Sequence, residues 1–543
     1  MNNHSPATHR ESSPRQATSS SAPLTEAKPA SGAPHTGQIA QIVRGEADAN
    51  TPTPKIRVAA VIPGFGRAAD IERLLQDLWR MNRKGIELWV VLCDNASPQP
   101  LADLVKPPEG LPFECFRNSH NAGGAGGFNA AMSRVLAGEG LSGQFPKPHF
   151  VWLLDSDARV GKNCLRPLVR VMLKNRKIVG AGSALTDQFT GIVYEIGGRI
   201  SKNKGEWGPA HWGNHDRRSV LSVDYLAACS MLVRRDAIEK TGLMPDIFIH
   251  GDDVRWSIAL TQATGGKLVG VPASRAYHPH FLGKFQTWTR YYGCRNGFPP
   301  IDMKKLGGWV RFRKALVETE RAVCQTIMAL DELGELHLQG IEDAIAGRTV
   351  GHHIAMGREK LIGLMRPEPM SKLAERLGQL RAEHGPSATT FIHPLLIANP
   401  NDLKDMRAQL TAAGLSVKLP KNWKGHDRYQ LRYRDLVGAA TRFMFGPNSD
   451  IAVVPTGWPT GWFRGKTLVE VTPDGFYVRK ISRAERAKKA ISVFVRGLKS
   501  AITLLNTVPP APPLPPAPIR KDHSPSQSPA HTTTAAGMQS ALT

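Results

Sequence analysis

Residues 151–160, VWLLDSDARV, decide the fold that this sequence predicts. The apolar first half is typical of a buried strand, and Asp155 and Asp157 follow at its carboxyl end. In an extended segment these two side chains point to the same side, so a hard divalent cation could meet both and keep positions open for phosphate oxygens. Because paired aspartates after a strand are more often turn formers or helix caps, the interpretation depends on the surrounding sequence.

The residues before this stretch predict a parallel strand-helix-strand unit. Residues 56–63 and 87–93 are apolar and rich in β-branched side chains, and residues 70–81 carry apolar side chains at helical spacing. A strand, a helix and a strand at this spacing form a parallel unit. The second strand runs into Asp94, another polar residue at the strand edge where open α/β sheets bind their ligands.

A glycine-rich run follows a short predicted strand at residues 113–116. Residues 121–128 read NAGGAGGF and lead into a helical pattern. Four glycines in five residues would let a nucleotide lie against the backbone, and the first N–H groups of the helix would face its anionic oxygens. The spacing matches neither the Rossmann fingerprint nor a Walker A loop. The alternative is a glycine-rich turn that lets a helix pack closely.

Three more candidate residues stand at the ends of predicted elements further along the chain. Asp252 and Asp253 come just before a helix, so they could cap its N-terminus or act as a catalytic base. A strand at residues 267–271 leads to His278, which could be a metal ligand. A lone histidine near an apolar strand is usually just satisfied by hydrogen bonds, so both interpretations stay open.

Composition limits the class of protein. The chain has 543 residues and a formal net charge of +24. Its six cysteines include no C-x-x-C pair, which is typical of reduced thiols in a cytoplasmic protein. We find neither a signal peptide nor an apolar run of about 18 residues, so we expect no translocation and no spanning helix. The positive charge favours binding to an acidic partner, which could be nucleic acid, an anionic membrane or a phosphorylated substrate. The charge alone does not distinguish among these partners.

Composition and periodicity divide the chain into five predicted parts. These are a disordered tail at residues 1–54, an α/β domain at 55–305, a helical region at 306–385, an accessory α/β region at 386–506 that ends in a basic amphipathic helix, and a Pro-rich disordered tail at 507–543. Low hydrophobicity without periodicity is the reason for both tails.

The predicted helix from Ser482 has two possible roles. An apolar stripe alternates with six basic side chains, a pattern that suits a helix lying on anionic lipid. The alternative is a basic surface helix docked on its own domain. The stripe consists of Ala487, Ile491, Phe494, Leu498, Ile502 and Leu505.

Taken in order, these motifs resemble the family 2 glycosyltransferases of the GT-A fold, and most of all their bacterial galactofuranosyltransferase and rhamnosyltransferase branch. The resemblance covers about residues 56–300 and implies an α/β fold, in which a GT-A (Rossmann-like) nucleotide-sugar-binding domain has a mostly parallel central sheet. One departure is Arg255, which stands where relatives commonly have an acidic residue. The motifs are the strand ending at Pro63, Asp94-Asn95-Ala96-Ser97, residues 121–128, Asp155-Ser156-Asp157, Leu232-Val233-Arg234-Arg235, Asp252-Asp253 and Tyr277-His278.

The resemblance also implies roles for individual residues. Asp253 matches the general base, with Asp252 beside it. Metal ligands for Mn²⁺ or Mg²⁺ would be Asp155, Asp157 and His278. Donor-binding residues would be Asp94, Arg117, Gly123, Gly124, Gly126, Gly127 and Asp155. Aromatic residues after the histidine could stack on acceptor sugars or pack a domain junction, and the acceptor-binding candidates are Trp256, Trp288 and Tyr292.

The predicted function is therefore a metal-dependent inverting glycosyltransferase. It would move a sugar, first of all galactofuranose from UDP-galactofuranose, to a lipid-linked or polysaccharide acceptor in cell-envelope glycan synthesis. The alternative donor is dTDP-rhamnose. A different class of function is a non-catalytic basic module that binds membrane or nucleic acid, although no nucleic-acid partner is expected. We expect a cytoplasmic protein, peripheral on the inner face of the membrane, and predict no oligomeric state.

Overall fold

The computed structural model describes the chain between residues 55 and 518, with gaps. The described residues are 55–188, 191–201, 206–210, 219–278, 289–298, 307–327, 331–348, 368–392, 409, 411–414, 449–455, 466–472, 475–480 and 483–518. The predicted tail at residues 1–54 and the candidate Trp288 lie outside these residues. No helix in the described ranges is long and apolar enough to cross a membrane.

A ten-stranded sheet forms the centre of the first domain. Its strand order is β10-β12-β6-β11-β4-β1-β2-β3, with β5 paired to β12 and β7 to β6. Strands β4, β1, β2 and β3 are parallel, as predicted, whereas β11 runs antiparallel between β4 and β6. The strands are β1 Ile56–Gly64, β2 Ile86–Asp94, β3 Phe113–Arg117, β4 Phe150–Leu154, β5 Arg159–Val160, β6 Ile178–Asp187, β7 Val193–Glu195, β10 Leu221–Val223, β11 Ser230–Arg234 and β12 Lys267–His278.

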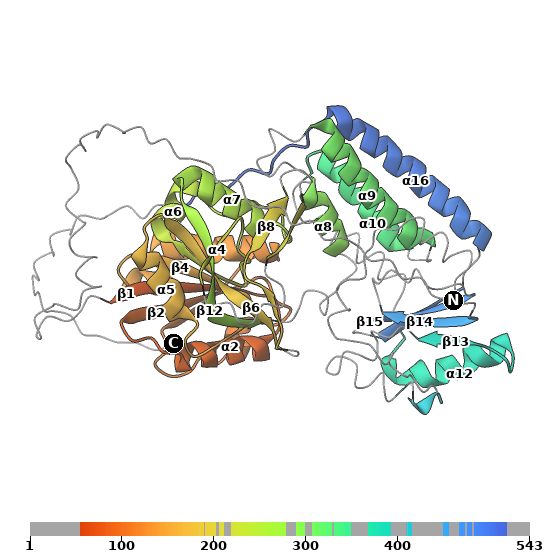
Figure 1. The fold of residues 1–543 in the computed structure, drawn as a ribbon. Helices are drawn as coiled ribbons and strands as arrows, with labels where there is room; N and C mark the ends of the chain where they lie inside the picture. The colour runs from red at the N-terminus through yellow and green to blue at the C-terminus, as the bar shows by residue number, and fades with distance from the viewer. Residues whose placement is uncertain are drawn as a thin grey trace, which may run out of the picture. The chain divides into compact units, whose positions relative to one another are not determined.

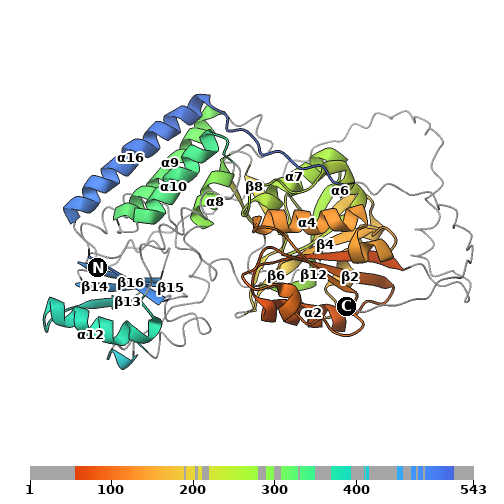
Figure 2. The ribbon, with the colours of Figure 1, turned by 180° about the vertical axis from the view of Figure 1, so that it is seen from behind.

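Helices cover both faces of this sheet. Helices α2 and α4 lie on opposite faces (Figures 1 and 2). Helix α2 buries Ile71, Leu74, Leu75 and Leu78, the apolar positions that predicted it, and each such side chain contributes about 1.5–3 kcal/mol on burial. The helices are α2 Ala68–Arg80, α3 Leu101–Leu104, α4 Gly123–Ala137, α5 Leu165–Lys174, α6 Arg235–Thr241 and α7 Asp252–Thr264, and a 3₁₀ turn, η1, spans Gly140–Gln144.

Register brings the predicted polar residues to one edge of the sheet. Gly64, the last residue of β1, pairs with Asp94, the last residue of β2. On the other side of β1, β4 ends at Leu154, directly before Asp155. A separate hairpin of β8 Gly198–Ser201 and β9 Glu206–Pro209 follows β7. The α/β fold with polar residues at the carboxyl ends of β2 and β4 is the arrangement that the sequence predicted.

A helical bundle follows the sheet domain. Helices α9 and α10 pack against each other, and the C-terminal helix α16 packs along α9 (Figure 1). Their shared core includes Ala315, Leu338, Ala501 and Leu504. From the sequence, α16 is predicted to belong to the accessory region, because contacts between distant segments leave no trace in periodicity. The helices are α8 Thr289–Gly297, α9 Gly308–Ile327, α10 Asp331–Ile345 and α16 Arg483–Asn506.

The accessory region contains a four-stranded sheet with the order β13-β14-β15-β16. The first three strands are parallel and β16 is antiparallel. Leu373, Leu377 and Leu380 of α12 join the core of this sheet. The elements are η3 Met370–Lys372, α12 Leu373–His384, β13 Thr390–Ile392, β14 Ile451–Pro455, β15 Thr467–Thr472 and β16 Gly475–Lys480.

Residues 507–518 return from α16 to the first domain. The N–H of Leu243 donates to the carbonyl of Pro515 at 2.7 Å, and Leu514 and Ala517 pack against the sheet-domain core. From the sequence, these residues are predicted to belong to a Pro-rich tail, because prolines and leucines outside any periodic element carry no signal of docking. The rest of that predicted tail, residues 519–543, lies outside the described residues.

Candidate active site

Two aspartates and a histidine meet at the end of β4. Strand β5, just after Asp157, pairs antiparallel with the end of β12, and this pairing places His278 beside the aspartates. Its Nε2 lies 3.3 Å from Oδ2 of Asp155 and 3.4 Å from Oδ1 of Asp157. Arg159 fixes the segment by a bidentate ion pair with Asp77 of α2, at 2.6 and 2.8 Å. We call Asp155, Asp157 and His278 the sheet-edge cluster.

The donor set of the sheet-edge cluster fits a divalent cation. One ligand atom from each residue lies within 4.8 Å of the others. Two carboxylates and an imidazole are ligands that Mn²⁺ accepts. Nδ1 of His278 is 3.0 Å from the hydroxyl of Tyr194, and if Nδ1 donates this bond, the lone pair of Nε2 faces the aspartates. Burial raises the pKa of Tyr194, which keeps it a phenol.

Arg67 holds the other oxygen of one of these carboxylates. Its Nη1 is 2.6 Å from Oδ2 of Asp157, and it stands in the left-handed region, φ 58°, just before α2. The Arg67 side chain is 45% exposed and that of Asp157 is 9% exposed. The guanidinium is therefore free to move into solvent, while the carboxylate is fixed.

Asp94 organises the neighbouring turn. Its carboxylate accepts hydrogen bonds from the N–H groups of Ser97 at 2.8 Å and Leu101 at 3.1 Å, and it pairs with Arg117. Burial alone would raise the pKa of Asp94, but these hydrogen bonds outweigh it and hold the pKa below its usual value. Asp94 is only 1% exposed, so the exposed partner at this corner is Arg117, whose side chain is 42% exposed.

The glycine run forms the first turn of α4. Gly123 has φ 75°, and a Cβ there would lie 2.2 Å from the carbonyl oxygen of Phe248, which accepts the N–H of Ala125 at 3.2 Å. A Cβ on Gly127 would lie 2.7 Å from that of Pro63. These two glycines therefore serve close packing. Gly124 and Gly126 lie between them in the sequence and are half-buried at the start of the helix.

The paired aspartates begin α7. Gly251 precedes them in the left-handed conformation. Oδ1 of Asp253 accepts the N–H of Val254 at 2.7 Å and Oδ2 accepts that of Ala228 at 3.3 Å, so the carboxylate has a fixed orientation. Burial raises the pKa of Asp253 and of Asp252. The charge of Asp155 acts in the same direction on both, which places the α7 pair near the sheet-edge cluster.

The structure adds Glu195, a residue that no sequence motif predicts. Its Oε1 is buried without a hydrogen-bond partner among the described residues. Burial, and after it the charge of Asp253, raises the pKa of Glu195 to about 8, and His278 acts in the opposite direction. Glu195 therefore lies within electrostatic reach of both Asp253 and His278. It sits at the end of the three-residue strand β7, which has no motif of its own.

Two predicted acceptor contacts require correction. Trp256 is 0% exposed, and its Nε1 donates to the carbonyl of Gly242 at 2.9 Å. Tyr292 is 1% exposed and stacks on Phe248 with ring centroids 5.0 Å apart. Side chains without exposed surface cannot stack on an acceptor sugar, so both are core residues. An aromatic side chain could either stack on an acceptor sugar or pack inside the protein, and the burial of these two residues supports packing.

One family model matches part of the sheet domain. Residues 59–242 match the family model described as "Glycosyl transferase family 2". This match confirms the predicted GT-A-like α/β fold. The matched segment includes Asp94, the glycine run and Asp155–Asp157, whereas the α7 pair and His278 follow it. No curated protein matches the chain.

The solved structures reported next have low sequence identity to this chain. A structure of GalNAc-T7 with UDP, GalNAc and Mn²⁺ is 19% identical, covers 46% of this chain and 48% of its own, and has a TM-score of 0.36. The mannosyltransferase PcManGT from Pyrobaculum calidifontis, with GDP-Man and Mn²⁺, is 13% identical over 61% and 87%, with a TM-score of 0.32. S. aureus TarS 1-349 with UDP is 12% identical over 60% and 79%, with a TM-score of 0.30. The chain thus spans about half the length of the first of these proteins.

Proposed function

We propose that this protein transfers a sugar from a nucleotide-sugar donor to an acceptor hydroxyl, with inversion at the anomeric carbon. The observation that carries the proposal is the sheet-edge cluster at the carboxyl edge of a sheet whose segment 59–242 matches family 2 glycosyltransferases. The half-buried Asp253 supports it, because the charge of Asp155 acts on the pKa of this carboxyl. Ligands of open α/β sheets bind at this edge.

The chain's residues divide the chemistry between two sides of the reacting carbon. Asp155, Asp157 and His278 would hold Mn²⁺ or Mg²⁺ against the donor diphosphate. When bound, such a cation neutralises the charge that develops on the leaving diphosphate. Asp253 accepts the proton of the acceptor hydroxyl as the new C–O bond forms and the bond to the diphosphate breaks. The N–H groups of Val254 and Ala228 keep its carboxylate oriented for this step.

Donor and acceptor identity rest on the sequence resemblance. UDP-galactofuranose is the first choice of donor and dTDP-rhamnose the second, and the acceptor is a lipid-linked or polysaccharide glycan of the cell envelope. A panel of nucleotide sugars with Mn²⁺, read by release of the nucleoside diphosphate on addition of acceptor, tests the assignment. If no donor is turned over and acidic polymers or lipids bind with a steep salt dependence, the protein is a non-catalytic binding module and not a transferase.

Asp253→Asn tests the mechanism. We expect transfer to fall by about 10²–10⁴-fold, because the amide cannot take the proton, while donor affinity stays within about twofold. The wild-type rate should also fall as the pH drops through the raised pKa of Asp253, since the protonated form is not a base. Asp103→Asn on the exposed side of α3 is the control and should keep the full rate. Wild-type turnover by Asp253→Asn contradicts the base assignment.

Helix α16 supports a peripheral membrane location, which we propose as the site of this activity. Its inner face packs on α9, where Gly497 meets Thr319. The apolar stripe that the sequence predicts to contact lipid lies on the opposite, outward face. Its members Ile491, Phe494 and Ile502 are 65%, 42% and 51% exposed. The helix is therefore docked and still presents an apolar surface. Exposed lysines at 488 and 499 flank that surface and suit anionic lipid.

Liposome sedimentation tests the membrane contact. Phe494→Glu should lower binding to vesicles that contain anionic phospholipid by about tenfold or more. The reason is that a negative charge then replaces an aromatic ring that would be buried in the lipid. Ser492→Glu adds the same charge beside the stripe and should cost much less. Equal losses in the two variants would show that only net charge matters, and unchanged binding in both would remove α16 from the contact.

A further inference from the structure

A strained turn leads directly into the helix that begins with the paired aspartates. Residues 247–251 come just before α7, and Phe248, His250 and Gly251 have φ angles of 72°, 68° and 78°. The left-handed region is accessible to glycine but costly for the other two residues. Backbone of this kind persists only where contacts with the rest of the protein hold it. We call residues 247–251 the α7 entry turn.

One side chain of α8 holds most of the α7 entry turn. Nδ2 of Asn296 donates to the carbonyl of Ile249 at 2.8 Å, to that of His250 at 2.9 Å and to that of Ile247 at 3.3 Å. Asn296 is buried, so water competes little for these bonds. An amide nitrogen has two N–H groups, so three acceptors engage it fully. The conformation of the turn therefore depends on this one amide.

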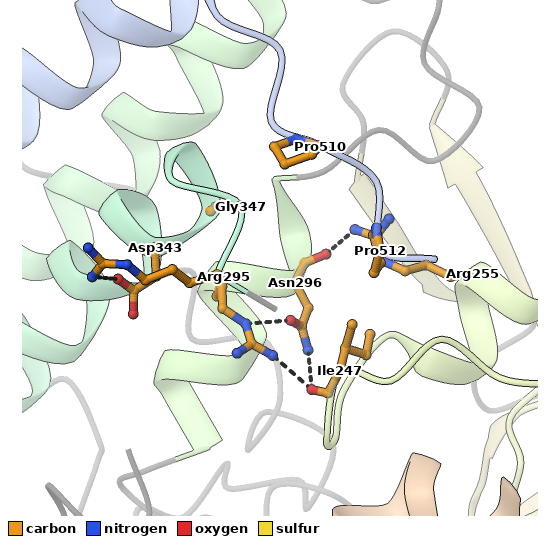
Figure 3. Close-up of a pocket in the computed structure, with 10 residues that line it drawn as sticks. Ile247, Arg255, Arg295, Asn296, Asp343, Gly347, Pro510 and Pro512 are labelled. Atoms are coloured by element: carbon orange, nitrogen blue, oxygen red, sulfur yellow. Dashed lines mark hydrogen bonds and ion pairs between the residues drawn. The ribbon is translucent and has the colours of Figure 1, made fainter. Parts of the chain in front are cut away.

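The neighbouring Arg295 fixes the orientation of that amide. Its Nε donates to Oδ1 of Asn296 at 2.9 Å, and its Nη2 donates to the carbonyl of Ile247 at 2.8 Å (Figure 3). The oxygen end of the amide is thus occupied, and the nitrogen end faces the turn. The reversed amide would set oxygen against carbonyl oxygens and nitrogen against an N–H donor, so only one orientation fits.

Helix α7 also binds back to Asn296. Arg255, two residues after Asp253, donates through Nη2 to the carbonyl of Asn296 (Figure 3). Asn296 therefore contacts the chain on both sides of the paired aspartates, through its side chain before them and through its carbonyl after them. This contact gives Arg255 a role that the acidic residue common here in relatives could not perform, since an ionised carboxylate cannot donate a hydrogen bond.

The remaining carbonyl of the turn is bound by the helix of the glycine run. The carbonyl oxygen of Phe248 accepts the N–H of Ala125 at 3.2 Å, and a Cβ on Gly123 would lie 2.2 Å from that oxygen. The α7 entry turn is thus held by α8 through three carbonyls and by α4 through the fourth. A shift of the turn would move Asp253 relative to the proposed donor-binding residues of α4.

We propose that Asn296 is a positioning residue, which sets the place of the Asp253 carboxylate by holding the α7 entry turn against α8. The inference rests on the proposed function, in which Asp253 accepts the proton of the acceptor hydroxyl. A displacement of about 1 Å in a catalytic group can cost about 10²-fold in rate. Metal-dependent binding of the donor diphosphate depends instead on the sheet-edge cluster, which belongs to β12 and to the segment after β4.

Steady-state kinetics and calorimetry on the full chain test this role. Asn296→Ala removes the amide and should lower kcat by roughly 10- to 100-fold, while the affinity for nucleoside diphosphate with Mn²⁺ stays within about twofold. The control is Leu504→Ala in the bundle core, which should lower the melting temperature but keep kcat within about twofold. A wild-type kcat in Asn296→Ala overturns the inference.

A double-mutant cycle separates positioning from general destabilisation. If Asn296 acts through Asp253, Asn296→Ala should cost less than about twofold in the Asp253→Asn background, because the base that it positions is already lost. An equal loss of rate in both backgrounds contradicts the inference. If Asp253→Asn alone keeps wild-type turnover, the base assignment of the proposed function fails, whereas loss of transfer in Asp253→Asn but not in Asn296→Ala removes only the positioning role.

A second pair of variants decides if Asn296→Ala does not fold. Arg255→Met releases the carbonyl of Asn296 from α7 and should lower kcat in the same direction, again with nearly unchanged affinity for the nucleoside diphosphate. Arg255→Lys restores a donor and should recover most of the lost rate. A wild-type kcat in Arg255→Met, or no recovery in Arg255→Lys, overturns the inference.

Discussion

Two groups of side chains in this protein have the composition of a metal site, and only one is suited to be one. The sheet-edge cluster consists of Asp155, Asp157 and His278. A second group, which we call the bundle cluster, consists of Cys294, Glu318 and His337 in the helical bundle. In both clusters, ligand atoms lie within 4.8 Å of one another. Proximity and residue type therefore do not distinguish them.

Exposure and charge compensation do distinguish them. Asp155 is 37% exposed, whereas all three members of the bundle cluster are buried. Burial acts to raise the pKa of Glu318, but Arg321 and His337 bind its two oxygens and lower the pKa to about 2. Burial raises the pKa of Cys294, so it stays a thiol. At the sheet edge, in contrast, Asp155 is exposed and the arginine that pairs with Asp157 is itself 45% exposed, so a cation could displace it, and the sheet-edge cluster suits a cation better than the bundle cluster does.

The largest expected effect is loss of the metal-dependent step at the sheet edge. Asp157→Ala should raise the activation free energy of transfer by several kcal/mol, which lowers the rate roughly 10³-fold. It should also abolish metal-dependent binding of the nucleoside diphosphate in calorimetry. Cys294→Ser changes the bundle cluster with little change in volume and should leave both quantities within about twofold. If Cys294→Ser instead weakens Mn²⁺ binding and Asp157→Ala does not, the roles of the two clusters are reversed.

The next effect concerns stability. Glu318→Ala removes the carboxylate that the buried His337 and the partly exposed Arg321 share, so we expect a loss of about 3 kcal/mol in the free energy of unfolding of the bundle. Asp155→Ala, at an exposed position, should cost less than about 1 kcal/mol. Denaturant-dependent hydrogen exchange measures the first change in α9 and α10 and the second in β4 and β12. Equal costs would show that the bundle cluster is not a structural ion-pair network.

The sequence predicted the sheet edge better than the bundle because its signals are local. Asp94 and Asp155 each follow an apolar strand, and parallel strands must end at a common edge, so the sequence already contained their proximity. His278 was placed beside them through the pairing of β5 with β12, which the sequence did not show. The domain boundaries and the roles of the site residues remain predictions.

The failures share one cause, which is that packing between distant segments leaves no periodic signal. Trp256 and Tyr292 are equally plausible as binding or core aromatics until their burial is known. The predicted stripe of α16 was correct as a stripe, but the packing face proved to be the one with Gly497 and Ala501. Glu195 could not be chosen, because its character comes from the groups around it and not from its neighbours in sequence.

A smaller effect tests how the histidine of the sheet-edge cluster is oriented. Tyr194→Phe removes the hydroxyl 3.0 Å from Nδ1 of His278 and should weaken Mn²⁺ affinity by about 10-fold, within the 10–100-fold range of such supporting contacts. Tyr277→Phe, on the same edge but 38% exposed, is the control. Manganese binding followed by electron paramagnetic resonance gives the affinities. An unchanged value in Tyr194→Phe would mean that His278 is not a ligand.

The smallest effect concerns the arginine that forms an ion pair with each cluster. Arg321 is held beside the buried Glu318, whereas Arg67 is 45% exposed and competes with a cation for Asp157. Arg67→Met should therefore tighten Mn²⁺ binding by about two- to fivefold, since an exposed ion pair is worth no more than about 1 kcal/mol. Arg73→Met, which breaks an exposed pair with Asp70, should change nothing. Weaker Mn²⁺ binding in Arg67→Met would show that this arginine supports the site instead of occupying it, and the contrast between an open cluster and a compensated one would then have to rest on burial alone.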